Sequence, residues 1–118
     1  MVVDTSAIIA ILKQETDHQA LAQTIYFSAE LCYMSAANLL ETYLVVVGSE
    51  NDPAVWEDVQ EFLLILGIEV VSLTQDDIAA AMYGYRMYGK GRHQAKLNFG
   101  DCFSYGVAKA RNLYRCCL

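Results

Sequence analysis

The sequence has few of the residues that break regular structure or cross-link a chain. Its 118 residues include one proline, seven glycines and four cysteines, and charged residues make up 19%. Hydrophobic residues make up 55%, so the composition excludes a disordered or collagen-like chain. Apolar runs such as Ala7–Leu12 are too short to span a membrane. We therefore expect a single domain over residues 1–118 with its own hydrophobic core.

The cysteines and the N-terminus also lack familiar signals. No two cysteines are separated by the two-residue gap of zinc and redox sites, and Cys116 and Cys117 are adjacent. The chain does not open with basic residues, an apolar stretch and a cleavage site, so we expect no cleaved secretory signal. These absences favour reduced thiols and a cytoplasmic location.

Basic residues are almost absent from the first 85 positions. Only Lys13 precedes Arg86, whereas 13 of the 14 acidic residues fall in that stretch. The net charge of −6 makes the chain a poor general binder of nucleic acid. Two interpretations stay open for the basic C-terminal third, which includes Arg92 and Lys96. It is either a surface that faces phosphate or an acidic partner, or a solvated face without a partner.

Short apolar runs alternate with helical patterns along the chain. We expect strands at residues 1–3, 31–34 and 68–71, where apolar or β-branched runs end at residues typical of turns or helix starts. This alternation is typical of a three-layer α/β/α domain with a central parallel sheet. The expected helices, delimited by caps, glycines and apolar periodicity, span residues 7–13, 17–29, 35–47, 53–67, 74–88 and 98–110.

Three acidic residues occupy places where such a sheet binds ligands. Asp4 follows the first strand, Glu41 lies on the helix after the second strand, and Asp101 lies at the start of the last helix. Ligands of open parallel sheets bind beyond the carboxyl ends of the strands. If the three strands are neighbours, the three carboxylates converge at that edge. Clustered carboxylates repel one another unless a cation neutralises them, and oxygen ligands favour Mg²⁺ or Mn²⁺.

Each of these acids also has a purely structural explanation. Asp4 would cap the first helix, and Asp101 would stabilise the dipole of the last helix from its first turn. Glu41 would be a solvated acid on an otherwise apolar helix. The functional interpretation therefore depends on the three acids acting together.

Three segments, taken in order, resemble the PIN domain. They are Val2–Ala7, Ser35–Glu41 and Leu97–Phe103. More narrowly, they are similar to the VapC-type toxins, the ribonuclease half of a toxin–antitoxin pair, and the resemblance covers nearly the whole chain. It implies a metal-dependent endoribonuclease that hydrolyses RNA with Mg²⁺ or Mn²⁺ as cofactor. It also implies a cognate antitoxin protein as partner and a homodimeric assembly.

The resemblance assigns the catalytic role to Asp4, Glu41 and Asp101. Asp4 and Asp101 would be direct metal ligands, and Glu41 would ligate through water or orient the attacking water. A metal held in this way positions phosphate, activates water and stabilises the leaving oxygen.

Four further residues are expected to support the site. The resemblance implies that the Ser6 hydroxyl supports the pocket and that Asn38 is a polar residue beside it. Arg92 and Lys96 belong to a basic stretch that would offset the charge of the substrate phosphates.

The chain departs from the family pattern at its C-terminus. Family members continue past the last helix into a short strand and an acid-rich turn with a fourth carboxylate, whereas no acid follows Asp101 here. We expect the last strand to be missing or replaced by a short tail, with lower stability and weaker activity. Two alternatives therefore stay open. One is a degenerate PIN-like module that binds an antitoxin or partner subunit without cutting RNA, and the other is a different Mg²⁺-dependent phosphohydrolase.

Overall fold

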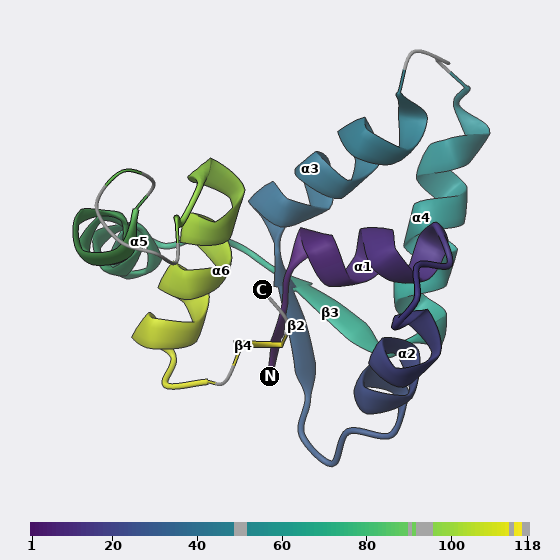
Figure 1. Ribbon diagram of the computed structural model, residues 1–118, viewed down its shortest axis with the longest axis horizontal. Helices are drawn as coiled ribbons and strands as arrows, with labels where there is room; N and C mark the ends of the chain where they lie inside the picture. The colour runs from purple at the N-terminus through teal and green to yellow at the C-terminus, as the bar shows by residue number, and fades with distance from the viewer. Residues whose placement is uncertain (49–51, 90, 92–95, 114, 117–118) are drawn as a thin grey trace.

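The computed structural model describes residues 1–48, 52–89, 91, 96–113 and 115–116 (Figure 1). Every strand pair is parallel and helices connect the strands, which confirms the predicted α/β fold with a central parallel sheet. The strands are β1 (Val2–Val3), β2 (Cys32–Ser35), β3 (Ile68–Val71) and β4 (Arg115–Cys116). The helices are α1 (Thr5–Leu12), α2 (His18–Tyr26), α3 (Ala36–Val47), α4 (Ala54–Ile65), α5 (Gln75–Tyr88) and α6 (Phe99–Ala110).

The sheet order is β3-β2-β1-β4. Val2 of β1 is paired with Tyr33 of β2, and β2 is paired with β3 from Cys32 to Ser35. Because β1 and β2 are parallel neighbours, their carboxyl ends lie at the same edge of the sheet. The residues that follow them, at the starts of α1 and α3, are therefore brought together.

The two residues of β1 serve opposite faces of the sheet, as the alternation of a strand requires. Val3 packs in a buried cluster that includes Ile8 of α1 and Leu63 of α4. Val2 packs in a second cluster that includes Val107 of α6. Figure 1 shows α5 and α6 on one side of the sheet and α1, α2 and α4 on the other. The predicted three layers are thus present, with a core on each face.

Polar side chains fix the helix starts where the sequence predicts caps. Ser35 caps α3 by accepting a hydrogen bond from the Asn38 amide, and Thr74 and Asp77 form a reciprocal capping box at the start of α5. Helix α2 ends at Tyr26, earlier than expected. The Ser28 hydroxyl instead donates a hydrogen bond to the Glu30 carbonyl and accepts one from the Glu30 amide. This local turn takes the place of a further turn of α2.

The tail of the chain contributes a short strand. The sequence predicts that the last strand is missing or replaced by a short tail, and the structure has the two-residue strand β4 in that place. It pairs in parallel with β1, with Val2 opposite Arg115 and Val3 opposite Cys116. The backbone of β1 therefore has a strand on both sides, which a missing strand would not provide.

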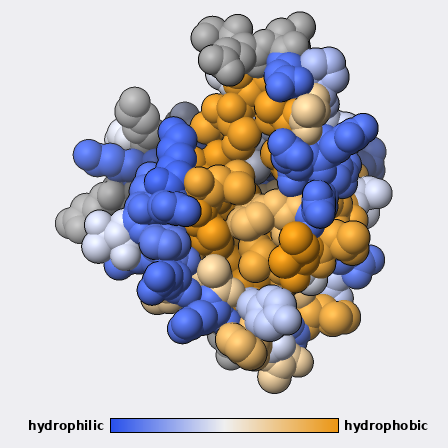
Figure 2. All heavy atoms as spheres, turned by 90° about the vertical axis from the view of Figure 1, so that its right-hand side faces the viewer, coloured by the Kyte–Doolittle hydropathy of each residue, from blue (hydrophilic) through white to orange (hydrophobic). Residues whose placement is uncertain are grey.

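Large apolar side chains remain exposed on the helices of one side. Figure 2 shows a broad hydrophobic area, bordered by hydrophilic residues, on the side of the molecule at the right of Figure 1. Apolar areas of this extent commonly mark contacts with partners. Within the described ranges, no helix has both the length and the apolar character needed to cross a membrane. The exposed large apolar residues of α1 to α4 are Leu12, Tyr26, Leu40, Leu44, Val45, Val46, Trp56, Leu64 and Ile65.

Candidate active site

One pocket, of about 330 Å³, is lined by all three acids selected from the sequence. Asp4 follows β1, Glu41 comes from the second turn of α3, and Asp101 comes from the first turn of α6. The three elements meet where β1 and β2 end, as the rule for parallel sheets predicts. The pocket is completed by Thr5, Ser6, Ile9, Glu15, Val45 and Asn98.

Asp4 is 2% exposed and is held at both carboxylate oxygens. Its Oδ2 accepts hydrogen bonds from the Ser6 amide (3.3 Å) and the Ser6 hydroxyl (2.8 Å), and its Oδ1 accepts one from the Ser104 hydroxyl (2.5 Å). The predicted role as the N-cap of α1 is confirmed. A carboxylate has about four lone-pair sites, so this capping role leaves room for a cation.

Asn38 connects the starts of α3 and α6. It is fully buried, and its Nδ2 donates to Glu41 Oε1 (3.3 Å) and to the Gly100 carbonyl (3.0 Å). Its Oδ1 accepts a hydrogen bond from the Ser35 hydroxyl (2.7 Å). Buried amides need such partners, so Asn38 fixes both the Glu41 carboxylate and the backbone of α6. Its part in catalysis stays a prediction.

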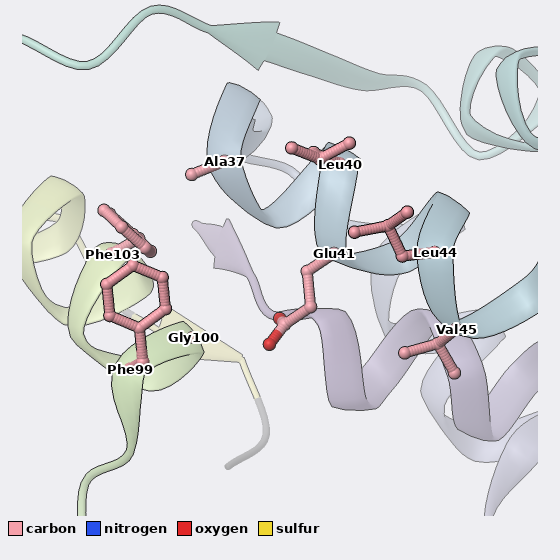
Figure 3. A pocket seen from close by; sticks show the side chains of 8 residues that line it. All are labelled: Ala37, Leu40, Glu41, Leu44, Val45, Phe99, Gly100 and Phe103. Atoms are coloured by element: carbon pink, nitrogen blue, oxygen red, sulfur yellow. The ribbon is translucent and has the colours of Figure 1, made fainter.

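Glu41 approaches the backbone of α6 where a side chain would not fit. A Cβ atom added at Gly100 would overlap with Glu41 Oε1 and Oε2. Figure 3 shows the Glu41 carboxylate reaching from α3 into the space beside Gly100. Glycine at this position therefore lets the carboxylate approach the start of α6, and Glu41 is more than a solvated acid.

Asp101 is half-buried and belongs to a capping box. Its Oδ2 accepts a hydrogen bond from the Asn98 amide (3.1 Å), and its own amide donates to Asn98 Oδ1 (2.9 Å). The predicted structural role at the start of α6 is thus present. The same side chain lines the pocket with Asp4 and Glu41, so the two interpretations of Asp101 are compatible.

Of the two basic residues expected near the substrate, the structure describes only one. Arg92 lies outside the described residues. Lys96 is exposed, has a backbone φ of 50°, and is not among the residues that line the pocket. The role of both residues stays a prediction.

Two residues of the site escaped the sequence analysis. Ser104 bonds Asp4 from inside the protein, and Glu15 adds a fourth carboxylate to the pocket wall. Ser104 follows Asp101 by three residues, so a search of the same helix face would have found it. Glu15 lies in the turn after α1, where no sequence pattern marks it.

The donor chemistry of the pocket fits Mg²⁺ or Mn²⁺. Mg²⁺ is commonly bound by one or two carboxylates and keeps several water ligands, which suits Asp4 and Asp101. Within the part of the chain that the structure describes, no three His, Cys, Asp or Glu side chains are grouped closely enough to hold one ion together.

An apolar groove adjoins the acidic pocket. It lies between α3 and α6 and shares Glu41 and Val45 with the pocket (Figure 3). Phe99 is 79% exposed, and its ring stands edge-on to that of Phe103, with centroids 4.8 Å apart. The groove is lined by Ala37, Leu40, Glu41, Leu44, Val45, Phe99, Gly100 and Phe103.

These features define a parallel α/β domain with an acidic pocket beyond the carboxyl ends of its strands. Residues 1–114 match the PIN domain family model. The chain is 40% identical to ribonuclease VapC30 of Mycobacterium tuberculosis over 92% of this chain and 82% of that protein. It is also 40% identical to a ribonuclease VapC of Mycolicibacterium smegmatis, over 92% of this chain and 83% of that protein. Ribonuclease VapC36 of M. tuberculosis is 36% identical over 92% of this chain and 78% of that protein. The chain belongs to the PIN-domain family, in its VapC group.

Proposed function

We propose that this chain is a metal-dependent endoribonuclease and the toxin of a toxin–antitoxin pair. The observation that carries the proposal is the single pocket lined by Asp4, Glu41 and Asp101 in a chain of the VapC group. Relatives that are 36–40% identical over 92% of the chain are named ribonucleases, which favours RNA over other phosphate esters as the substrate.

The proposed division of labour follows the geometry of the pocket. Asp4 and Asp101 hold Mg²⁺ or Mn²⁺, and such an ion, when bound, neutralises phosphate charge and lowers the pKa of water. Glu41, oriented by Asn38, accepts a hydrogen bond from the attacking water beside the scissile phosphate. Lys96 and Arg92 stand in the basic stretch that follows α5 and attract the RNA backbone.

We propose a cognate antitoxin as the protein partner. The hydrophobic area of Figure 2 and the groove between α3 and α6 offer contact for an apolar segment. The acids beside the groove favour a basic residue of the partner in the pocket.

Glu41→Gln and high salt would then weaken the complex. Binding that neither change affects would contradict a contact directed at the pocket. The homodimer implied by the resemblance stays part of this proposal.

The second candidate is a PIN-like module that binds a partner without cutting RNA. The observation in its favour is that, within the described residues, no three carboxylates are grouped closely enough to share an ion. A reading frame for a small antitoxin beside the gene would be compatible with either candidate. Only an assay of cleavage separates them.

The test is RNA cleavage by the purified protein with Mg²⁺ and with a chelator. We expect cleavage that requires Mg²⁺ and falls more than about 100-fold in Asp4→Asn, because changes to outer-sphere groups alone typically cost about 10–100-fold. Asparagine caps a helix as well as aspartate does, so this variant removes charge while it keeps the start of α1.

The matched control is Asp58→Asn, which makes the same change at an exposed position of α4. It should cleave like the unaltered protein. Cleavage that survives the chelator or the Asp4→Asn change would contradict the metal-dependent mechanism. Absence of cleavage by the unaltered protein, together with antitoxin binding, would favour the non-cleaving module.

A further inference from the structure

The Ser104 hydroxyl lies between two acceptors inside the protein. Ser104 is fully buried on α6, and its Oγ is 2.5 Å from Asp4 Oδ1 and 3.1 Å from Asn38 Oδ1. A buried hydroxyl beside a buried carboxylate is a costly arrangement unless the two are bonded. The contact joins residues 100 positions apart in sequence, so it ties α6 directly to the end of β1.

The orientation of Asn38 decides where the single Ser104 proton goes. The Asn38 amide group faces the Gly100 carbonyl and the Glu41 carboxylate, which both accept hydrogen bonds. Turning the amide by 180° would place its oxygen against these acceptors, so Nδ2 belongs where it stands. The oxygen of Asn38 therefore faces Ser104 and already accepts the Ser35 proton. The Ser104 proton is left for Asp4, the closer and negatively charged acceptor.

Asp4 is thereby fixed from two sides. Ser6 bonds Oδ2 from the exposed first turn of α1, and Ser104 bonds Oδ1 from the buried side. These donors hold both oxygens of the carboxylate. Oδ2 accepts two hydrogen bonds from Ser6, whereas Oδ1 accepts, from the described residues, only the one from Ser104 and keeps a lone pair for a cation. Without Ser104, none of the described donors would hold Oδ1.

We propose that Ser104 is a positioning residue that holds the Asp4 carboxylate in the orientation in which it binds a divalent cation. The inference rests on the proposed metal-dependent function, because Asp4 is a ligand only there. Ser104 itself touches neither the cation nor the RNA. Groups that orient metal ligands in this way typically contribute about 10–100-fold to metal affinity.

The test compares Ser104→Ala with Thr42→Val by titration of Mn²⁺. The free ion is followed through its electron paramagnetic resonance signal. Thr42 is fully buried, and its hydroxyl bonds the Asn38 carbonyl but not Asp4. Both changes remove one buried hydroxyl, so a merely structural role predicts similar effects. We expect Ser104→Ala to weaken Mn²⁺ binding about 10-fold or more. Thr42→Val should bind Mn²⁺ as the unaltered protein does, at a comparable melting temperature.

A second readout separates positioning from loss of the ligand. Raising Mg²⁺ should restore cleavage in Ser104→Ala, whereas it should not restore cleavage in Asp4→Asn. Ser104→Cys keeps a weaker donor of similar size and should fall between serine and alanine in Mn²⁺ affinity. If Ser104→Ala does not fold, the cysteine variant carries the test alone.

The outcomes distinguish this inference from the proposed function. Unchanged Mn²⁺ affinity in Ser104→Ala, or an equal loss in Thr42→Val, would overturn the positioning role. An unaltered protein that binds Mn²⁺ but does not cut RNA would overturn the proposed nuclease while Ser104 keeps its role. An unaltered protein that binds no Mn²⁺ would overturn both.

Discussion

Asp4 and Asp77 are both buried aspartates at helix starts, yet their hydrogen-bond partners differ in charge. Asp4 is 2% exposed and Asp77 is 1% exposed. Asp77 receives both Nε (3.4 Å) and Nη2 (3.1 Å) of Arg111, whose guanidinium also donates to the Ser72 carbonyl (3.0 Å). The described partners of Asp4 are two hydroxyls and an amide, which supply dipoles but no positive charge.

The two acids differ in whether a cationic side chain of the protein already pairs with them. The Arg111 side chain is 33% exposed and closes the Asp77 site from the surface, so this ion pair is complete within the protein. Asp4 opens onto a pocket that it shares with Glu41 and Asp101. A buried carboxylate without a cationic partner is costly, and a divalent ion removes that cost. The comparison supports a structural role for Asp77 and the proposed metal-binding role for Asp4.

Among changes that leave every charged residue in place, the largest effect is expected from one that moves the Glu41 carboxylate. Gly100→Ala places a methyl group where the Glu41 carboxylate stands, so the carboxylate must move away. We expect cleavage to fall by about 100-fold, at the upper end of the range for groups around a metal. The measurement is RNA cleavage at saturating Mg²⁺. Gly48→Ala is a control for an added methyl group in open space, although its positive φ makes it strained.

Cleavage by Gly100→Ala at the level of the unaltered protein would mean that the position of Glu41 does not matter. The assignment of Glu41 to the attacking water would then be wrong, while the role of Asp4 would be unaffected.

A smaller effect, on stability alone, is expected when Asp77 loses its partner Arg111. Arg111→Ala leaves Asp77 buried and without its cation. We expect the free energy of unfolding to fall by about 2 kcal/mol, less than the roughly 3–5 kcal/mol of fully buried pairs, because Arg111 is partly solvated. Denaturant unfolding at neutral pH measures this difference. A loss of Mn²⁺ affinity in a still-folded Arg111→Ala protein would show that the Asp77–Arg111 pair and the Asp4 pocket do not act independently.

Acid should reduce the difference in the free energy of unfolding between the unaltered protein and Arg111→Ala. Burial raises the pKa of Asp77, but the hydrogen bonds and charge of Arg111 and the bonds from Thr74 outweigh it, so the pKa lies below its usual value. The pair therefore contributes stability that is fully present above about pH 4 and is lost as the pH falls through the lowered pKa. We expect Arg111→Ala to cost less at pH 3 than at pH 7, by about 1 kcal/mol. An equal cost at both values would show that the charge of Asp77 does not matter.

The sequence predicts the fold and the three acids because both depend on local patterns. Alternating apolar runs predict parallel strands, and the carboxyl ends of such strands place Asp4 and the start of α3 together. Capping residues such as Ser35 and Asn98 mark helix starts whatever the rest of the chain does. These signals need no knowledge of distant contacts.

The contacts between distant segments escape such patterns. The bond from Ser104 to Asp4 joins α6 to β1, and the place of Glu15 depends on how the turn after α1 lies over the pocket. The pairing of β4 with β1 is equally invisible in a tail of few residues. Arg111 and Asp77 are likewise separated by 34 positions, so their ion pair emerges only when α5 and α6 pack together.

The metal-binding role of Asp4 and the structural role of Asp77 are tested together by a calorimetric titration of Mg²⁺ into the unaltered protein, Asp4→Asn and Asp77→Asn, with a thermal melt of each. We expect Asp4→Asn to lose Mg²⁺ binding while its melting temperature stays close to that of the unaltered protein. We expect Asp77→Asn to bind Mg²⁺ normally and to melt at a lower temperature. Normal Mg²⁺ binding by Asp4→Asn, or loss of binding in a folded Asp77→Asn protein, would contradict these roles.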